Sequence, residues 1–583
     1  MAYADDVDIG ERSIPAERKR GARALVLGVG IVLSSAAVVA RVGRFGFNPT
    51  DQGFVLAQVW RVLHGEIPQV DFLGPRPFGS AYLHLIDHLV PAPLMIGSAF
   101  VMMVQLTVAT FALAALLTGT SPLAWGPLRL GLVFAAALVC LNTYPLMAWH
   151  TVDGVFLVAV GWWLLDSGLR SGTRWRRWLG LFCLGFAIIV KQSFLFAAPI
   201  GLLILLFHPA APPKKASRLL GDVLVLGAAP VLYFGMVTVA GGLRSAIAQL
   251  SGGRQTWGES LFRFWTAEFA GRADPRTYLV PVLLGVFVLA LARGRLGEPG
   301  RWFRAATALC VVAVVVFVVA DGGFEHAGSW PISLLWLFLA AAALDAVRRR
   351  RLPWQHLAIA SLGWMASLSW GYPLPGLLAG IFALGVLEAV AEDLPRPPKI
   401  AGGVLGAAAF VLATLQLLSA HDKAPYADRP QGELTKDLGD IAPSLRGIRT
   451  NPSVHRYVAQ IRDCLDRYPA SRVAVLPDNP FVATIFGVRN PFPVDWPLPM
   501  ELTGDSPERM VEAAKSLDRE GNYLVLFETI EPVSLTAGAP VPDSVALDTP
   551  TIGLSGIEGR IKDELTGTRV TCGSFTGFWA SSR

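Results

Sequence analysis

Long apolar blocks recur along the chain from residue 24 to residue 418, and most of them reach about 17 to 22 residues. An α-helix needs about 20 apolar residues to cross the hydrocarbon core of a bilayer, so each block is a candidate membrane span. Hydrophobic residues make up 53% of the 583 residues and charged residues only 16%, which is too little charge for a soluble surface. The sequence therefore excludes a soluble enzyme, a nucleic-acid-binding protein and a disordered scaffold, and it predicts an all-α polytopic membrane protein.

We expect thirteen spans, with one long loop after the first. They are residues 24–41, 93–116, 128–147, 153–168, 178–190, 193–207, 219–239, 277–292, 303–320, 329–346, 355–371, 374–391 and 400–418. Lys and Arg concentrate on the cytoplasmic side of membrane proteins, and a cytoplasmic segment 1–23 puts 23 of them inside against 10 outside before residue 419. This orientation predicts a multi-pass protein of the cell membrane with its C-terminal segment outside. The first span could instead be a cleaved signal peptide, but its length and the spans after it favour a retained anchor.

Residues 419–583, the tail domain, differ from the rest of the chain in charge and in pattern. They carry a formal charge of −5, against +11 for residues 1–418. Runs with helical spacing alternate with strand-like runs at 455–469, 472–477, 507–521, 523–530, 553–565 and 569–580. We therefore expect a small extracytoplasmic α/β domain, joined to the last span of the 24–418 membrane domain by residues 419–450. Cys464 and Cys572 would form a disulfide in an oxidising compartment, and two separate thiols are the alternative.

The first outside loop, residues 42–92, is much longer than its neighbours. Residues 52–63 have the pattern of an amphipathic helix that could lie flat on the membrane surface. Asp51 directly precedes this helix, where an aspartate often caps the N-terminus. Asp71 follows in the same loop, where acidic residues are common without a special role. The loop therefore offers carboxylates at the outer membrane surface, and the residues alone leave their roles open.

The first loop carries a series of short motifs. They are Asp51-Gln52-Gly53, Leu63-His64-Gly65-Glu66-Ile67-Pro68, Asp71-Phe72 and Gly74-Pro75. The series resembles the first-loop signature of the polytopic C-fold (GT-C) glycosyltransferases, which include the dolichyl-phosphate-mannose protein mannosyltransferases and the aminoarabinose lipid A transferases. The motif resemblance covers residues 48–80, and the arrangement of spans, outer loop and outer C-terminal domain extends it to the whole chain. Many relatives have two adjacent acids where this chain has Asp51 followed by Gln52.

The resemblance implies an inverting glycosyltransferase that uses a polyprenyl-phosphate monosaccharide as the donor, with Asp51 as the general base. The leaving group of such a donor is already an anionic phosphate, so the enzyme must supply a base for the acceptor hydroxyl and cations for the phosphate. The candidate substrate-binding residues are Asp71, Arg76, His150, Lys191, Gln192, Arg254, Arg263 and His326. The sugar, a hexose or a pentose, and the acceptor, a lipid, polysaccharide or protein, stay open.

Several of these residues also have simpler explanations. Lys191 interrupts an apolar run, and a lysine at that depth can extend to the interface without binding a ligand. The loop 242–276, which holds Arg254 and Arg263, is basic and aromatic. That composition suits a lipid head group and a sugar ring, but an interfacial amphipathic helix has it too.

A metal site is a further candidate. His84, Asp87 and His88 lie within five residues, and the spacing of the two histidines puts them on one side of an α-helix, as the ligands of a divalent metal would be. An interfacial helix accounts for the same residues, so no cofactor is firmly expected.

Two other classes of membrane protein remain open. An ion-coupled transporter or flippase needs ionisable residues or broken helices near the bilayer midplane, whereas the ionisable residues here fall near span ends: Asp166, Lys191, Asp222, Asp345 and Glu388. A lipid-linked polysaccharide polymerase or ligase would also work at the outer face, but it favours a large loop late in the chain. A purely structural scaffold would not need so long an ordered first loop. Glycosyl transfer at the outer face, among membrane lipids, is therefore the favoured function.

Overall fold

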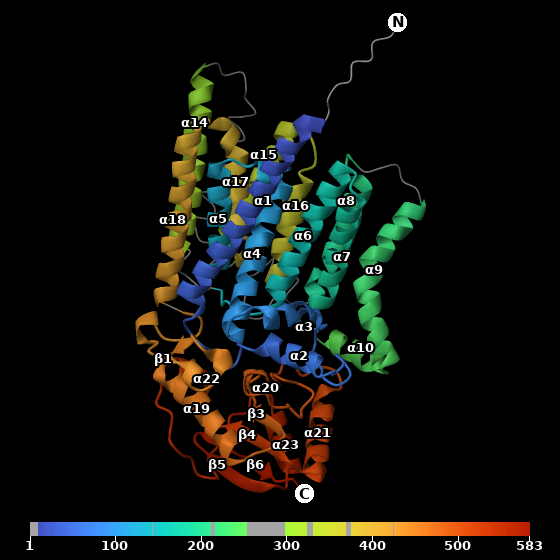
Figure 1. Cartoon of the computed structure of the whole chain (residues 1–583), viewed down its shortest axis with the longest axis vertical. Helices are drawn as coiled ribbons and strands as arrows, with labels where there is room; N and C mark the ends of the chain where they lie inside the picture. Colours follow the sequence, from blue (N-terminus) through green and yellow to red (C-terminus); the bar gives the residue numbers. More distant parts are fainter. Residues whose placement is uncertain are drawn as a thin grey trace.

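The computed structural model describes residues 10–142, 144–210, 216–252, 298–322, 330–368, 375–423 and 425–582. The described chain is mostly helical. A bundle of long helices forms one end of the molecule, the tail domain forms the other, and the first loop lies between them (Figure 1).

The helical bundle contains most of the described helices. They are α1 (Gly10–Val38), α4 (Leu94–Thr118), α5 (Pro127–Leu141), α6 (His150–Ser171), α7 (Arg174–Val190), α8 (Ala197–Phe207), α9 (Ala216–Val239), α10 (Leu243–Gly252), α14 (Glu298–Gly322), α15 (Trp330–Arg349), α16 (Trp354–Ser367), α17 (Ala379–Val390) and α18 (Lys399–Lys423). Seven of the helices in the described ranges are long and apolar enough to cross a membrane: α1, α4, α6, α9, α14, α15 and α18. The expected span 277–292 lies outside the described residues, and α5, α8 and α17 are apolar but shorter. The chain is thus compatible with a membrane-embedded protein, and the count of thirteen spans stays a prediction.

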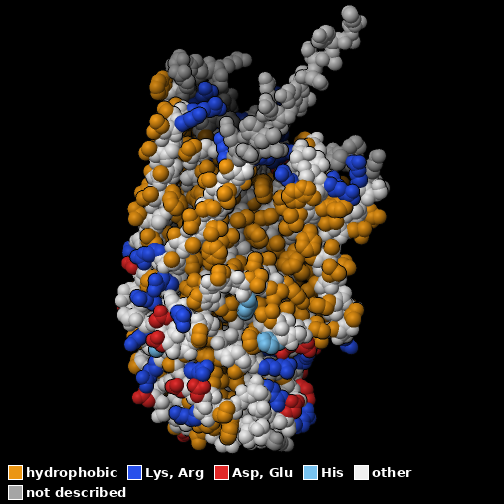
Figure 2. Space-filling view, in the orientation of Figure 1, with side chains coloured by type: hydrophobic (Ala, Val, Ile, Leu, Met, Phe, Trp, Pro, Cys, Tyr) orange, Lys and Arg blue, Asp and Glu red, His pale blue; other side chains and the backbone are white. Residues whose placement is uncertain are grey.

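The outside of the helical bundle is apolar. Figure 2 shows hydrophobic side chains gathered over the bundle and charged side chains over the tail domain. Large apolar side chains point outwards from the helices, among them Val231, 70% exposed, and Ile400, 84% exposed. A soluble protein rarely exposes a contiguous apolar surface of this extent, so the bundle fits a lipid environment.

The tail domain combines helices with a four-stranded sheet. Its strands are β3 (Arg472–Leu476), β4 (Tyr523–Glu528), β5 (Thr568–Cys572) and β6 (Phe575–Ala580), in the order β3-β4-β6-β5. Its main helices are α19 (Pro452–Arg467), α20 (Phe481–Phe486), α21 (Ser506–Glu520), α22 (Pro532–Thr536) and α23 (Ile557–Glu564). β3 and β4 are parallel, whereas β6 is antiparallel to both of its neighbours. The expected last strand, 569–580, is divided by a turn at Gly573, where φ is +56°.

Two links hold the tail domain together and fasten it to the first loop. Cys464 of α19 and Cys572 of β5 form a disulfide, with their Cα atoms 5.7 Å apart. In the segment before α19, β1 (Lys436–Asp437) pairs with β2 (Arg449–Thr450). Arg449 also forms a β-bridge with Phe45, at the beginning of the first loop. The connecting segment is therefore packed against the first loop.

The first loop is enclosed by protein. The helix expected over 52–63 is α2 (Phe54–Leu63), and most of its residues are buried. It packs against α20 of the tail domain, so the expectation of a helix lying on the membrane surface is wrong. Gly53 permits this contact, because its φ is +94° and a Cβ there would lie 2.7 Å from the Cβ of Phe481.

Candidate functional site

Asp51 lies just before α2, but it does not cap that helix. The N-cap residue is Gly53, and no side chain caps the helix. The Asp51 carboxylate instead accepts a hydrogen bond from the hydroxyl of Tyr426, which follows α18, and another from Asn48 Nδ2 at 3.3 Å. The helix-cap explanation is therefore wrong, and two neutral donors hold this carboxylate.

A second carboxylate, Asp478, approaches Asp51 from the tail domain. Asp478 follows β3, and its Oδ1 accepts a hydrogen bond from Trp496 Nε1. Burial raises the pKa of Asp478 to about 7 against the opposing hydrogen bond from Trp496, and the nearby charge of Asp51 adds to the rise. Burial also raises the pKa of Asp51, against the opposing hydrogen bond from Tyr426. Among the described residues neither carboxylate has an ion-pair partner, so burial makes both groups costly to ionise.

Two aromatic side chains, Phe54 and Trp496, connect Asp478 with Arg76 and His150 through a series of contacts. Their ring centroids are 5.0 Å apart, and the Phe54 ring also lies 5.7 Å from that of His150. The guanidinium carbon of Arg76 is 5.6 Å from the centre of the Phe54 ring. Phe54 therefore contacts Arg76 and His150, and Trp496 contacts Asp478 through its Nε1.

The cations come from three separate parts of the chain. Arg76 belongs to the first loop and forms an ion pair with Glu501 of the tail domain. Lys191 follows α7, and its Nζ donates a hydrogen bond to Thr151 Oγ1 at 3.0 Å, with no carboxylate partner among the described residues. His150 is the first residue of α6, and it is only 4% exposed. The three groups lie close together and form a basic cluster. Burial, and then the nearby charges of Arg76 and Lys191, lower the pKa of His150 well below its ordinary value, and burial with the charge of Arg76 lowers the pKa of Lys191 to about 7.

Local contacts hold the part of the first loop around Pro75 and Arg76 against the C-terminal end of α7. Gln192 Nε2 donates a hydrogen bond to the carbonyl of Pro75. Gly79, at the start of α3 (Gly79–Leu83), permits close approach, because a Cβ there would lie 2.5 Å from the carbonyl oxygen of Ile189. Four expected substrate-binding residues are thus brought together: Arg76, His150, Lys191 and Gln192.

The other expected residues lie elsewhere. Asp71 is exposed, and its carboxylate accepts the Ile67 N–H at 2.7 Å, so it closes a turn in the first loop. It lines a separate pocket of about 470 Å³ between the first loop and α21. The remaining three, Arg254, Arg263 and His326, lie outside the described residues.

The two histidines considered as metal ligands, His84 and His88, do not face a common site. His84 is fully buried, with Nδ1 at 2.9 Å from Asp87 and Nε2 at 2.9 Å from Asp153. Burial lowers the pKa of His84, but the two carboxylates outweigh it and raise the pKa to about 10, so the ring is protonated and has no lone pair for a metal. His88 is exposed, because 84–89 form the 3₁₀-helix η2, in which positions four apart face different directions. Across the described ranges, no group of three or more His, Cys, Asp or Glu side chains could hold a metal ion.

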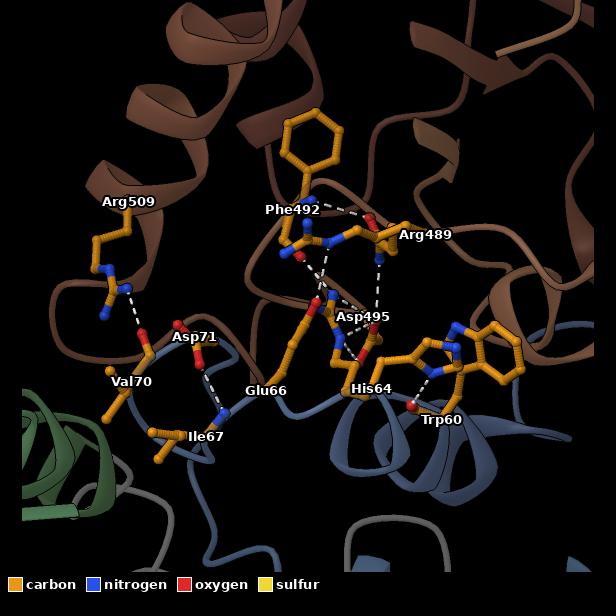
Figure 3. A network of polar contacts seen from close by, with 12 residues as sticks. Trp60, His64, Glu66, Ile67, Val70, Asp71, Arg489, Phe492, Asp495 and Arg509 are labelled. Carbon is orange, nitrogen blue, oxygen red and sulfur yellow. Dashed lines mark hydrogen bonds and ion pairs between the residues drawn. The ribbon is translucent and has the colours of Figure 1, made fainter. Parts of the chain in front are cut away.

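A network of ion pairs fastens the tail domain to the first loop beside this site (Figure 3). Arg61 of α2 pairs with Glu66 at 2.7 Å and with Asp495 of the tail domain at 2.8 Å. Arg489 of the tail domain joins Glu66 at 3.1 Å. These four residues, which we call the Arg61 clamp, each have a partner of opposite charge.

A narrow pocket runs between the first loop and the tail domain. Phe54, Arg76, His150, Asp495 and Glu501 are among the residues that line it. Its volume is about 10 Å³, roughly the room that one water molecule needs. A sugar phosphate could therefore enter only if the first loop and the tail domain moved apart.

The contribution of the tail domain was missed by the sequence reasoning. A signal for Asp478 was present, because it directly follows the buried strand expected at 472–477, and binding residues often lie beyond the carboxyl ends of strands. Trp496 and Glu501 lie in an irregular segment, where no periodic pattern indicated a role. The site therefore includes residues that only the folded chain brings to it.

Comparison with known proteins does not assign the chain to a family. No family model matches it, and no curated protein matches it significantly. The functional interpretation therefore depends on the chemistry of the site itself.

Proposed function

We propose that the protein is an integral membrane glycosyltransferase of the C-fold type, which transfers a hexose or pentose from a polyprenyl-phosphate donor to an extracytoplasmic acceptor. The observation that carries the proposal is a set of charged groups without partners of opposite charge among the described residues. Asp51 has no cation in the described structure and is held by Tyr426 and Asn48, and Lys191 has no carboxylate there and donates to Thr151. A sugar phosphate needs both, because cations hold its phosphate and a carboxylate can activate the acceptor hydroxyl.

In the proposed reaction Asp51 is the general base. It takes the proton of the acceptor hydroxyl as that oxygen attacks the anomeric carbon of the sugar. The bond from the anomeric carbon to the phosphate oxygen breaks, and polyprenyl phosphate leaves as an anion held by Lys191 and Arg76. The displacement is direct, so the anomeric configuration is inverted. Phe54 and Trp496 offer ring faces on which a sugar can pack.

The position of the site suits a lipid-linked donor. It lies where the apolar bundle meets the tail domain, and α1 begins at the opposite end of the bundle (Figure 1). A chain whose N-terminal helix starts on one side and whose tail domain lies on the other needs an odd number of spans, and thirteen meets this condition. The disulfide between Cys464 and Cys572 favours an oxidising compartment for the tail domain. We therefore place the N-terminus in the cytoplasm and the tail domain outside.

Turnover of a panel of polyprenyl-phosphate sugars by the purified protein, with membrane extract as the acceptor source, tests the proposal. We expect the wild type to release free polyprenyl phosphate. Asp51→Asn should lower the rate by about 10²- to 10⁴-fold, the usual contribution of a general base, and keep donor binding. Asp466→Asn, on the exposed side of α19, makes the same change away from the site and should turn over normally.

Two results would contradict the proposal. One is the absence of polyprenyl phosphate release from every donor. The other is equal turnover by the wild type and Asp51→Asn.

A further inference from the structure

We propose that the acceptor is a glycan of neutral sugars and that it binds in a groove between the first loop and the tail domain, which we call the acceptor groove. The groove consists of the pocket of about 470 Å³ beside α21 and a second pocket of about 180 Å³ beside α2. The inference rests on the proposed function, and it names the class of acceptor that the function left open.

Shared lining residues join the two pockets into one groove. Four residues line both pockets: Arg61, Glu66, Arg489 and Asn490. Trp60 in the smaller pocket and Asp71 in the larger one lie on opposite sides of Glu66 (Figure 3). The larger pocket alone, at about 470 Å³, falls within the range of about 300 to 1,000 Å³ that is usual for ligand sites. The groove can therefore take a ligand without the movement that the narrow pocket requires.

Residues 490–495 of the tail domain form a wall between the groove and the candidate site. Pro493 lines the larger pocket of the groove, whereas its neighbours Val494 and Asp495 line the narrow pocket of the site. The carbonyl of Pro493 accepts the N–H of Leu73 at 2.7 Å, which holds this wall against the first loop. A chain bound in the groove therefore lies beside the place where the donor sugar would react.

The charges around the larger pocket are balanced, with four arginines and four acids. Arg472 forms an ion pair with Glu520, and Arg489 forms one with Glu66. A phosphate is held best by cations that no carboxylate neutralises, so this lining does not favour the anionic end of the donor. A sugar hydroxyl both donates and accepts hydrogen bonds, and it can therefore use guanidinium and carboxylate groups that lie side by side. The balance favours a neutral ligand with many hydroxyls.

Trp60 of α2 adds an aromatic surface to these polar groups. It lines the smaller pocket together with His64, and the centroids of the two rings are 3.9 Å apart. Gly487 of the tail domain faces Trp60 without a side chain to cover it, since even a Cβ there would lie 3.9 Å from Cη2 of the indole. Trp combines a large apolar face with a polar edge, and a sugar ring has a matching apolar C–H face and polar hydroxyls. The groove thus offers both kinds of contact that a glycan makes.

Binding of fluorescently labelled hexasaccharides to the purified full chain tests the groove without any donor. The panel contains unbranched chains of neutral hexoses and of neutral pentoses, and a chain of uronic acids as the anionic comparison. We expect the wild type to bind at least one neutral chain, and Trp60→Ala to bind it at least about tenfold more weakly, because an aromatic anchor is lost. Trp579→Ala removes an equally half-buried indole from β6, away from the lining of the groove, and should bind as the wild type does.

Asp71→Asn is a second variant that keeps the local fold. Asp71 Oδ2 accepts the Ile67 N–H at 2.7 Å, and the amide oxygen of an asparagine can accept the same bond, so the turn is preserved. The change removes a charged acceptor from the groove, and affinity for the neutral chain should fall by about tenfold. Asp466→Asn, on the exposed side of α19, is the matched control and should not change the affinity.

The outcomes separate the groove from the proposed function. Three results overturn the groove even if polyprenyl phosphate is released with a protein or lipid acceptor. They are binding of no neutral chain, tighter binding of the uronic acid chain than of every neutral chain, and an affinity that Trp60→Ala or Asp71→Asn leaves unchanged. Binding that both substitutions weaken, without release of polyprenyl phosphate from any donor, supports the groove and contradicts the glycosyltransferase.

Discussion

Two groups of charged residues lie where the first loop meets the tail domain. In one group the charges are paired, and in the other several charged side chains have no partner of opposite charge among the described residues. In the Arg61 clamp every charge has a partner within 3.1 Å. At the candidate site, Asp51 and Asp478 have no cation, and Lys191 has no carboxylate, within the part of the chain that the structure describes. The same interface therefore contains charges that hold it together and charges that are left for a ligand.

The difference indicates which charges serve stability and which serve function. Arg61, with a side chain 6% exposed, is buried with both of its partners. Breaking a buried pair is costly because the remaining charge has no compensation. A charge kept without a partner lowers stability, and such groups are concentrated at functional sites. We therefore expect substitutions in the clamp to unfold the interface and substitutions in the site to change binding or turnover.

Removal of Arg61 should have the largest effect. Arg61→Ala leaves Asp495 buried without a cation and Glu66 with Arg489 as its only cation among the described residues, and it should lower the free energy of unfolding by about 3–5 kcal/mol. Thermal unfolding in detergent measures the loss. Lys191→Met is the matched control, since it removes a charge that has no carboxylate partner in the described structure, and its stability should change by less than about 1 kcal/mol. Equal losses in the two variants would remove the distinction between clamp and site.

His84 extends the comparison to a partnered charge elsewhere in the first loop. Its pKa rises from 6.5 to about 10, because Asp87 and Asp153 outweigh the effect of burial. The stabilising contribution is therefore complete below pH 6.5 and is lost as the pH rises towards 10. We expect the Tm of the wild type to fall over this range more steeply than that of His84→Gln, which cannot titrate. Parallel Tm curves would show that His84 is not charged in the folded state.

A smaller effect is expected at Gly53, which sets the distance between the first loop and the tail domain. Gly53→Ala puts a Cβ against Phe481, whereas Gly65, with φ +80°, has nothing within 4 Å of the same position. Both substitutions strain a positive φ, so their difference isolates the close contact. Gly53→Ala should lose about 1–3 kcal/mol more than Gly65→Ala, the usual effect of overpacking. Unfolding midpoints in denaturant measure this difference, and identical midpoints would contradict the close approach.

The large features could be predicted from the sequence because their signals are local. Apolar blocks predicted the long helices, and alternating patterns predicted the helices and strands of the tail domain. Other features depend on contacts that leave no periodic pattern. The amphipathic pattern of α2 could not show whether its apolar face meets lipid or the tail domain. The spacing of His84 and His88 assumed an α-helix, whereas the chain forms a 3₁₀-helix there.

The contribution of Asp478 was the least predictable part of the site. Asp51 and Asp478 are separated by most of the chain, and Asp478 lies near the first loop only because the tail domain packs against it. The sequence indicated Asp51 through its place in the first loop, and it showed Asp478 only as a polar residue after a strand.

The measurement that tests the central claim most directly is the affinity for a polyprenyl-phosphate sugar of the wild type beside Lys191→Met. A hydrogen bond to a charged group contributes about 1.5–3 kcal/mol, so the donor Kd should rise by about 10- to 150-fold while the fold stays intact. An unchanged Kd would contradict the account, because the unpartnered lysine would then have no role in holding the donor phosphate.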